Sequence, residues 1–476
     1  MDFLPFSGHN APLLPAKQGL AARYDAAMTT NHNRKHWRNA DYLSVNASNL
    51  PLIRRDLRSR ARYEIANNSY AKGIVLTLAN DTVGQGPALQ MLTPDVAANK
   101  FIENEFEKWG AQIGLAEKLR TMRMAKAGDG EAFAMMIEDQ SLRSPVTLNL
   151  RLYEADQVSA FGAPVWSMTD GIFLDDNGNP IIYTLLRQHP GDLGALWFQS
   201  EPIPAAAMIH YFRPDRPGQV RGIPEITAAL PLFAMLRDYS LATLDAAKAA
   251  AYFAAVLYTD APPDGTADTS VQSMDSIELE RNMATTLPQG WKIGQVRAEH
   301  PTNTYKEFKH EILNEIARCL NMPFNIAACN SSGYNYSSGR MDHQTYFKSI
   351  KVEQGDMEAK ILDRILGAWL YEASRIDGYL PQSARRLSFV PTHQWFWPGS
   401  EHVDPQKEAE AQSIRLNSLT TSLAHEYAKA GLDWEKQLEQ IAKERKKMAA
   451  LSIEMAPTTP KGTPVKNPEE AGVAND

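Results

Sequence analysis

Apolar residues recur every three to four positions in several long stretches of the chain, a spacing that predicts helices. The first stretch follows Pro51, a residue suited to a helix start, and contains Ile53, Leu57, Tyr63 and Ile65. Further helices are expected in 95–110, 222–252, 304–323, 338–374 and 401–455. For the stretch 222–252, Pro224 and Glu225 suit a first turn, and Pro231 predicts a kink.

The pattern between residues 130 and 212 is different, with short apolar runs separated by turn signals, and predicts β-strands. Within it, Asp175–Pro180 (DDNGNP) is typical of a hairpin turn. The same letters resemble a calcium loop, but the bidentate acid that such a loop needs is missing. A further strand pair is expected around LPQGWKIGQV, in a segment between two long helices. The fold class is therefore α+β and predominantly helical.

Composition narrows the classes of function. The chain has 476 residues, enough for a sizeable core, a formal net charge of −7 and two cysteines. So few cysteines argue against a disulfide framework, and the acidic balance gives no sign of tight DNA binding. The longest apolar stretch is too short to span a bilayer and contains Lys248, so no membrane partner is expected. A basic, aromatic patch (NRKHWRNADY) in the first 50 residues is read as a solvated face, with nucleic-acid contact as the alternative.

The sequence contains no recognisable catalytic motif. Phosphate-binding P-loops, GxSxG elbows and HExxH zinc motifs are missing. Cys319, Cys329 and His310 do not make a closed zinc site, and Cys319 is read as a small core residue. We therefore expect no catalytic residue, no metal and no cofactor. The loop NSSGYNYSSGR (330–340) remains open as a connector, a phosphate-contacting loop or a serine nucleophile, with Ser337 or Ser338 capping the next helix.

Three segments in order along the chain resemble lambda-type portal proteins of tailed phages. They are RYEIANNSYAKGIVLTLANDTVGQG, IPAAAMIHYFRPDRPGQVRGIPEI, and the long stretch from WFWPGSEHVDPQKEAE to KERKKM. Each is weak alone, but together they span roughly residues 20 to 450.

The resemblance implies a portal fold with wing, stem, clip and crown. Its regions would be an arm (1–50), wing (51–221), stem helix (222–252), clip (253–303), second stem helix (304–323), tunnel loop (324–340), tunnel and wing helix with its return (341–400), crown helices (401–455) and a disordered tail (456–476). It also implies a dodecameric ring at a capsid vertex of the virion, assembled in the host cytoplasm. Double-stranded DNA would pass through this ring, and its partners would be the terminase, the major capsid and scaffold proteins and the head–tail connector proteins.

Two sets of candidate site residues follow from the resemblance. The tunnel loop would present Asn330, Ser331, Ser332, Tyr334, Asn335, Tyr336 and Arg340 to the DNA. In that loop Gly333 and Gly339 would allow the backbone to change, and the tyrosines would narrow the bore. Arg340 would either touch phosphate or, as the favoured alternative, pair with Asp342 or with another subunit. The clip would present Asp264, Asp268, Asp275, Glu278 and Glu280 to the terminase, unless they form only a solvated loop. Two other classes stay open, a head–tail ring adaptor and a hydrolase with a dispersed active site.

Overall fold

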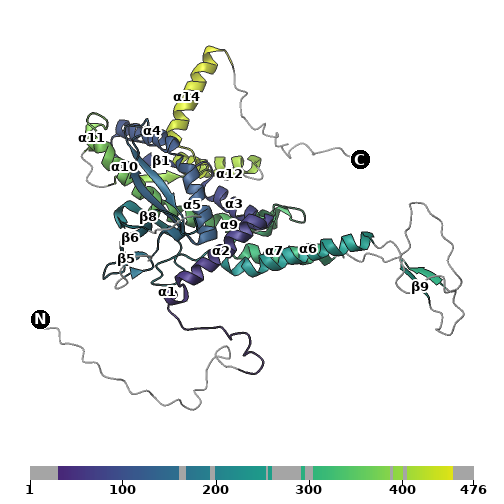
Figure 1. Cartoon of the computed structure of the whole chain (residues 1–476). Coiled ribbons are helices and arrows are strands. Elements are labelled where there is room, and N and C mark those ends of the chain that lie inside the picture. Colours follow the sequence, from purple (N-terminus) through teal and green to yellow (C-terminus); the bar gives the residue numbers. More distant parts are fainter. Residues whose placement is uncertain are drawn as a thin grey trace, which may run out of the picture.

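The computed structural model describes residues 30–159, 168–192, 199–252, 256–259, 291–294, 304–385, 390–399 and 405–453. They form a body of helices and small sheets, from which two helices, α6 and α7, project side by side (Figure 1). A single helix near the C-terminal end, α14, projects from another face (Figure 1). The fold is thus α+β and mainly helical, as the residue pattern predicts.

The first part of the body is helical. Its helices are α1 (Val45–Ser48), α2 (Pro51–Asn67), α3 (Ser69–Val83), α4 (Val96–Gln112) and α5 (Leu115–Asp129). Pro51 opens α2 as expected, because the N–H that proline lacks has no partner in a first turn. Asn68 separates α2 from α3, and its side chain accepts hydrogen bonds from the backbone of Tyr70 and Ala71. Gly130 ends α5 with a φ of 89°, where a left-handed conformation favours glycine.

Strands occupy the region that the alternating pattern predicts. One sheet has the order β3-β2-β8 and the other β4-β5-β6-β7, all antiparallel. Their bounds are β2 (Glu131–Glu138), β3 (Leu148–Tyr153), β4 (Met168–Thr169), β5 (Ile172–Leu174), β6 (Pro180–Leu186), β7 (Ser200–Pro204) and β8 (Met208–Phe212). The hairpin at 175–180 is confirmed, since Asp175 accepts hydrogen bonds from the backbone of Asn177 and Asn179.

The projecting pair is antiparallel. After a short 3₁₀ turn (Thr227–Ala229), α6 (Leu230–Tyr252) runs outward and α7 (Thr304–Arg318) returns. Tyr239 of α6 stacks on Tyr305 of α7, with ring centroids 5.5 Å apart. At the outer end, β9 (Val256–Thr259) pairs with β10 (Trp291–Gly294). This short ladder pairs a strand that follows α6 in the chain with one that precedes α7.

Two predictions about this pair were wrong in detail. The helix expected from residue 222 begins at Leu230, so Pro224 and Glu225 lie outside it and Pro231 stands in its first turn rather than at a kink. The part of LPQGWKIGQV that the structure describes, Trp291–Gly294, pairs with Val256–Thr259. The returning helix ends at Arg318, and a separate short helix, α8 (Phe324–Ala327), follows Pro323.

The long helix expected from 338 to 374 exists but is not uniform. It comprises α9 (Tyr336–Met357), one π-helical turn (Glu358–Leu362) and α10 (Asp363–Arg375). The short α11 (Gln382–Arg385) comes next. Strand β11 (His393–Phe396) then pairs with β1 (Ala88–Met91) across some three hundred residues of chain.

The C-terminal helices are α12 (Pro405–Asn417), α13 (Leu423–Lys429) and α14 (Trp434–Ala450). Asp433 caps α14 by accepting a hydrogen bond from the backbone of Glu435, as expected from an acidic helix start. Apart from this cap region, α14 contributes no buried residue to the body. Among the described residues, no helix is long and apolar enough to cross a membrane.

Three clusters of buried apolar residues form the core. The largest joins α4, α5, the β3-β2-β8 sheet and α10 around Trp109 and Trp369. The second joins α2, α3, α8 and α9 to the inner ends of α6 and α7, which contribute Phe233 and Ile316. A smaller cluster lies under the β4–β7 sheet. The projecting helices are thus anchored in the core only at their inner ends.

Candidate functional site

The loop between α8 and α9 is exposed, and hydrogen bonds within the loop hold its conformation. Asn330, Ser331 and Ser332 are exposed, and the Asn330 side chain accepts a hydrogen bond from the Ser332 backbone at 2.9 Å. Gly333 has a φ of 92°, a conformation that side chains with a Cβ rarely adopt. These residues offer amide and hydroxyl groups to solvent without a fixed charge.

The helix after the loop begins earlier than predicted. Asn335, not Ser337 or Ser338, is the cap, and its side chain accepts a hydrogen bond from the Ser338 backbone at 2.9 Å. Gly339 is therefore part of α9, with its amide bonded to the carbonyl of Asn335. The loop proper is shorter than the predicted 324–340.

The predicted loop residues do not all face the same way. Tyr334 is partly buried and packs against the second core cluster, and burial raises the pKa of its hydroxyl. The Tyr334 ring therefore anchors the loop to the body, while its predicted role in narrowing the bore stays a prediction. Tyr336 opens α9. Arg340 is exposed on α9, and within the described part of the chain no ion pair joins it to Asp342.

The predicted clip residues lie outside the described residues. This applies to Asp264, Asp268, Asp275, Glu278 and Glu280. They remain an expectation based on the family resemblance.

Helix α9 is fastened to α3 by buried polar contacts. The Tyr346 hydroxyl donates to Asp81 Oδ2 at 2.8 Å, and Gln354 Nε2 donates to the carbonyl of Thr82 at 3.0 Å. Burial, followed by the Asp81 carboxylate, raises the pKa of Tyr346 above its ordinary value, so the phenol stays protonated and donates. At the start of the loop, Asn325 contacts His343 at 2.8 Å. The exposed loop is thus carried by a firmly held helix.

A buried cluster around Glu353 joins α9 to α5, β8 and the segment before α6. Glu353 Oε1 lies 2.5 Å from Lys126 Nζ and accepts a hydrogen bond from the Tyr211 hydroxyl. On α5, Arg123 pairs with Glu225 at 2.8 Å and lies 3.5 Å from Glu353. Burial alone would raise the pKa of Glu353, but Arg123 and Lys126 outweigh it and lower that pKa to about 2. We call these residues the Glu353 cluster.

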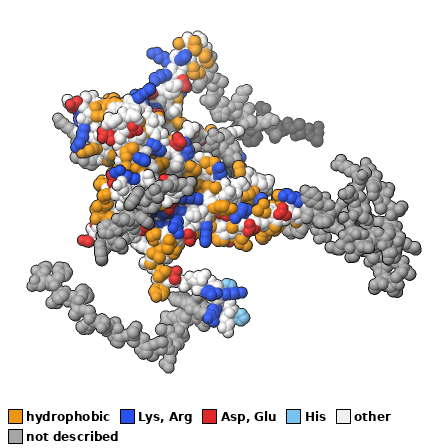
Figure 2. Space-filling view, viewed as in Figure 1, with side chains coloured by type: hydrophobic (Ala, Val, Ile, Leu, Met, Phe, Trp, Pro, Cys, Tyr) orange, Lys and Arg blue, Asp and Glu red, His pale blue; other side chains and the backbone are white. Residues whose placement is uncertain are grey.

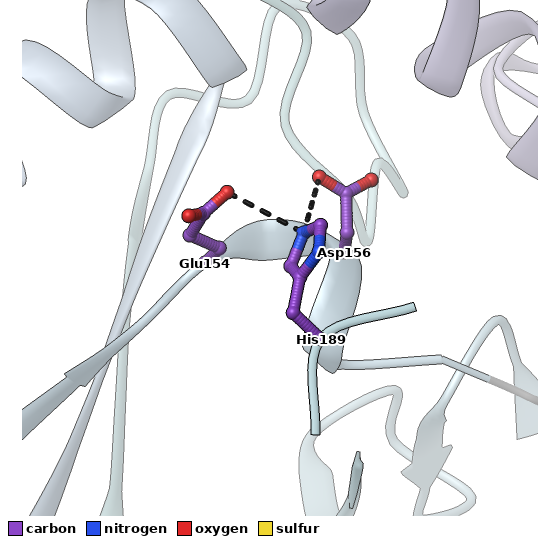
Figure 3. A group of neighbouring side chains, drawn as sticks. All are labelled: Glu154, Asp156 and His189. Carbon is purple, nitrogen blue, oxygen red and sulfur yellow. Dashed lines mark ion pairs between the residues drawn. The ribbon is translucent and has the colours of Figure 1, made fainter. Parts of the chain in front are cut away.

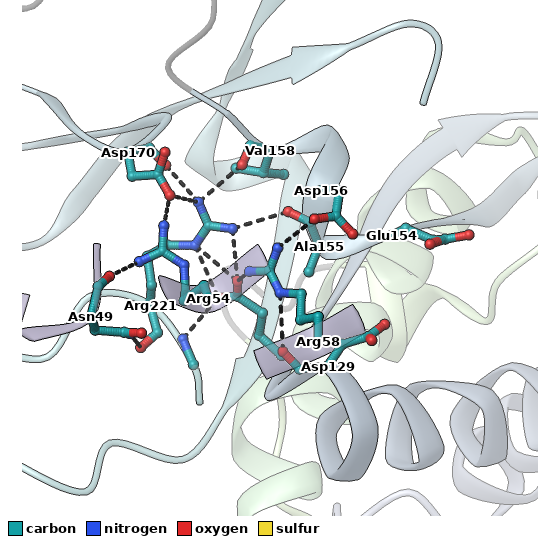
Figure 4. A network of polar contacts seen from close by, with 12 residues as sticks. Asn49, Arg54, Arg58, Asp129, Glu154, Ala155, Asp156, Val158, Asp170 and Arg221 are labelled. Carbon is teal, nitrogen blue, oxygen red and sulfur yellow. Dashed lines mark hydrogen bonds and ion pairs between the residues drawn. The ribbon is translucent and has the colours of Figure 1, made fainter. Parts of the chain in front are cut away.

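A second buried cluster surrounds Glu131 at the start of β2. Arg221 Nη2 lies 2.7 Å and Arg58 Nη2 2.6 Å from Glu131 Oε1, and Glu131 Oε2 accepts the backbone N–H of Gly222 at 2.9 Å. Arg221 also donates to the carbonyl of Val158 and to the Asp170 carboxylate, which contacts Arg54 (Figure 4). We call this set the Glu131 cluster.

The electrostatics of the Glu131 cluster favour the ionised acid. Burial would raise the pKa of Glu131, but Arg221, His210 and Arg58 outweigh it and hold that pKa well below its usual range. A carboxylate buried among guanidinium groups is strongly linked to them, because removal of one partner leaves an uncompensated buried charge.

Two glycines let the chain pass between the clusters. A Cβ on Gly222 would lie 2.1 Å from the carbonyl oxygen of Gly130, and one on Gly130 would lie 2.4 Å from the carbonyl carbon of Ile223. Residues 221–225, which we call the root segment, are therefore fixed by close backbone contact. Arg221 binds the Glu131 cluster and Glu225 binds the Glu353 cluster. This arrangement fixes the entry to α6 and explains why the helix cannot begin at 222.

Neither cluster was predicted from the pattern of residues. The available signal was weak: Arg54 and Arg58 are spaced by four on the buried face of α2, and Glu131 stands between Gly130 and the apolar run of β2. Charged residues at buried positions need partners, but the sequence does not reveal which distant residues supply them.

Glu154, Asp156 and His189 form a group with the right residue types for a metal ion (Figure 3). His189 Nε2 lies 3.4 Å from Glu154 Oε2 and 3.7 Å from Asp156 Oδ2. However, Arg62 already bridges the same two carboxylates at 3.0 and 2.8 Å, and Arg58 binds Asp156 at 2.9 Å. Since guanidinium groups neutralise the acids, the arrangement does not fit a metal site.

Comparison with known proteins identifies the class. Residues 31–354 match the model of the phage portal proteins, a class of structural proteins. Because this match spans more than half of the sequence, the chain belongs to the lambda family of phage portal proteins.

Individual relatives are distant. The probable portal protein of Halomonas phage phiHAP-1 is 26% identical over 436 residues, which cover 83% of this chain and 81% of that protein. Among solved structures, a chain in the neck of the native gene transfer agent particle, computed with C12 symmetry, has a TM-score of 0.46 and 14% identity, covering 79% of this chain and 94% of that chain. A chain in the virion of the native gene transfer agent particle has a TM-score of 0.43 and 13% identity, and the match covers 79% of this chain and 93% of that chain.

Proposed function

We propose that twelve copies of this chain form a ring at one vertex of a phage capsid, through which double-stranded DNA is packaged and later ejected. The observation that carries the proposal is membership of the lambda portal family over residues 31–354. The subunit acts as a structural component, without catalysis or cofactor. It joins the capsid vertex of the virion after assembly in the host cytoplasm.

The projecting pair supports the assignment of stem and clip. Helices α6 and α7 run antiparallel out of the core, and the β9–β10 ladder lies in the part of the chain that connects them (Figure 1). In the proposed ring α6 (Leu230–Tyr252) and α7 (Thr304–Arg318) form the stem, and 253–303 form the clip. The body forms the wing, and α12 to α14 form the crown. The N-terminal arm (1–50) and the tail (456–476) flank these regions.

The partners follow from these regions. The clip, with its acidic residues, docks the terminase during packaging and the head–tail connector proteins afterwards, and the major capsid and scaffold proteins surround the wing. Docking through carboxylates makes the affinity for a basic terminase surface fall with added salt.

The loop before α9 contacts the DNA in this proposal. Asn330, Ser331 and Ser332 are exposed and uncharged, so they offer exchangeable hydrogen bonds to phosphate without the strong, salt-dependent grip of a row of cations. A channel that passes DNA in both directions needs such weak contacts. Tyr334 serves as the anchor of the loop rather than as its tip.

The ring is tested on the purified full chain by native mass spectrometry and negative-stain electron microscopy. We expect a closed oligomer of twelve subunits. A chain that stays monomeric at high concentration and at several salt levels contradicts the proposal.

Negative charge placed in the loop tests the DNA contact. Ser331→Asp with Ser332→Asp adds two charges per subunit at exposed positions, while the backbone bonds of the loop stay available. We expect intact rings and shorter packaged DNA in capsids assembled around them, with the defect strongest at low salt because salt screens the repulsion. The control, Asn177→Asp with Gln188→Asp, places the same charges at exposed positions near and after the β5–β6 hairpin. Equal DNA lengths for both variants at low salt would assign the loop a connector role.

A further inference from the structure

The outer face of α7 carries a stripe of acids. Glu307, Glu311 and Glu315 are exposed and spaced by four residues, so each lies about 40° further round the helix than the last. Phe308, which is 49% exposed, borders the stripe. Within the described residues, Glu307 and Glu315 have no ion-pair partner, and Glu311 is paired with His310 at 3.3 Å. We call this face the acidic stripe.

The outer face of α9 carries the opposite charge. Arg340, Lys348 and Lys351 are exposed and share one arc of about 80°. Met341 and Val352, which are 69% and 67% exposed, border this arc. In the part of the chain that the structure describes, the three cations form no ion pair. We call this face the basic stripe.

Each stripe faces away from its own subunit. The opposite side of α7 buries Leu313 and Ile316 in the second core cluster, and that of α9 buries Tyr346 and Ile350 there. On the visible face of the molecule, acidic and hydrophobic side chains lie next to one another on the projecting pair (Figure 2). Large apolar side chains exposed beside unpaired charges are characteristic of protein interfaces.

The two stripes are similar in length and opposite in charge. Glu307 and Glu315 are eight residues apart, as are Arg340 and Lys348, and eight residues of helix rise about 12 Å. In each stripe an apolar border lies to one side of the charges, so Phe308 has Met341 or Val352 as a counterpart. DNA would satisfy the cations but would leave Met341 and Val352 in contact with charged phosphate.

We propose that the basic stripe on α9 of one subunit docks on the acidic stripe on α7 of the next copy of this chain. The proposal rests on the ring proposed above and specifies the contact that sets its register. Two different surfaces that join head to tail form a heterologous interface, which closes into a ring when the rotation between copies is fixed. The charges set the register, and the apolar borders exclude water between them.

Charge reversal tests the pairing. Lys348→Glu with Lys351→Glu reverses the basic stripe, and Glu311→Lys with Glu315→Lys reverses the acidic one. We expect each double variant to raise the protein concentration needed for half-maximal ring formation at least about tenfold, because like charges then face each other. The quadruple variant should return to within about threefold of the parent, since the pairing is restored with opposite sign. Lys446→Glu with Lys447→Glu on α14 makes the same change in charge away from both stripes and should leave assembly unchanged.

A cross-link tests the geometry directly. In a chain with Cys319→Ser and Cys329→Ser, Lys348→Cys is combined with Glu315→Cys, which tests parallel stripes, or with Glu307→Cys, which tests antiparallel stripes, so each pair places one thiol on each stripe. Mild oxidation of assembled rings should give a ladder of covalent oligomers on a non-reducing gel, whereas either single cysteine variant should give at most dimers.

The outcomes separate the two proposals. If the parent forms rings but the reversals assemble normally and no ladder appears, the stripe pairing is overturned and the ring stands. If the parent remains monomeric, the ring itself is overturned. If Lys348→Glu with Lys351→Glu leaves assembly normal but shortens packaged DNA, the basic stripe faces DNA and the pairing is overturned.

Discussion

Replacement of Glu353 by Gln removes the central anion of the Glu353 cluster while keeping the shape of the side chain. The pKa of this carboxyl is lowered from 4.5 to about 2 in the folded protein. A shift of this size corresponds to about 3 kcal/mol in favour of the folded, ionised state, at about 1.4 kcal/mol per pKa unit. Since Gln resembles the protonated acid, Glu353→Gln should lower the free energy of unfolding by a similar amount, about 3 kcal/mol at neutral pH.

The dependence on pH has a definite sign. A carboxyl whose pKa is depressed by folding stabilises the protein above its unfolded pKa and loses that contribution as the pH falls through the folded value. For Glu353 the window runs from about 4.5 down to about 2. The difference in stability between the parent and Glu353→Gln should therefore be constant above about pH 5 and should shrink as the pH falls within that window.

Urea unfolding followed by tryptophan fluorescence measures the difference. Glu201→Gln is the matched control, because Glu201 pairs with Arg187 at 3.3 Å on the surface, with half of its side chain exposed. Glu201→Gln should lower the free energy of unfolding by less than about 1 kcal/mol. Adding Lys126→Met to Glu353→Gln should cost less than the sum of the two single changes, since the fully buried Lys126 would no longer be left without its closest anion. A cost below about 1 kcal/mol for Glu353→Gln, with no change between pH 6 and pH 3, would refute the electrostatic reasoning.

Two further predictions concern the root segment. Gly222→Ala should destabilise the fold by about 4 kcal/mol or prevent folding, because the new Cβ would lie 2.1 Å from the Gly130 carbonyl oxygen. The control Gly355→Ala in α9, whose Cβ would meet nothing within 4 Å, should be neutral or stabilising. Thermal unfolding of both variants tests this, and equal melting temperatures would contradict the close backbone contact. Arg221→Met should lower the free energy of unfolding by about 3–5 kcal/mol, because it leaves Glu131 with too few cations, and should accelerate hydrogen exchange of residues 222–236. The surface control Arg187→Met should lower it by less than about 1 kcal/mol. Unchanged exchange in 222–236 would show that Arg221 does not hold the root segment.

The parts of the fold that were predicted correctly depend on short stretches of sequence. Pro51 marks the start of α2, Asp433 caps α14, and the Asn-Gly turn at 177–178 lies in the hairpin between β5 and β6. In each case the information lies within a few residues of the element. The family resemblance likewise rests on stretches of contiguous sequence, and the match to residues 31–354 confirms it.

Features that depend on distant partners were missed. Helical spacing extended α6 back to 222, but Glu225 is bound to Arg123 and Gly222 lies against Gly130, contacts made across about ninety or more residues of chain. The pairing of β1 with β11 and of β10 with β9 has no local signature either. For the loop, composition indicated exposure correctly but not that Tyr334 turns inward to the core.

The way the projecting pair ends has a consequence for how such proteins diversify. Val256 lies opposite Gly294 and Thr259 opposite Trp291, so the chain leaves and re-enters the described structure at one point. The core holds only the inner ends of α6 and α7, including Phe233 and Ile316. Residues 260–290 therefore begin and end next to one another, as tolerated insertions do, and their replacement should leave the fold of the body intact. A lineage can then exchange these residues, and an engineer can graft a foreign domain there, without redesigning the rest of the subunit.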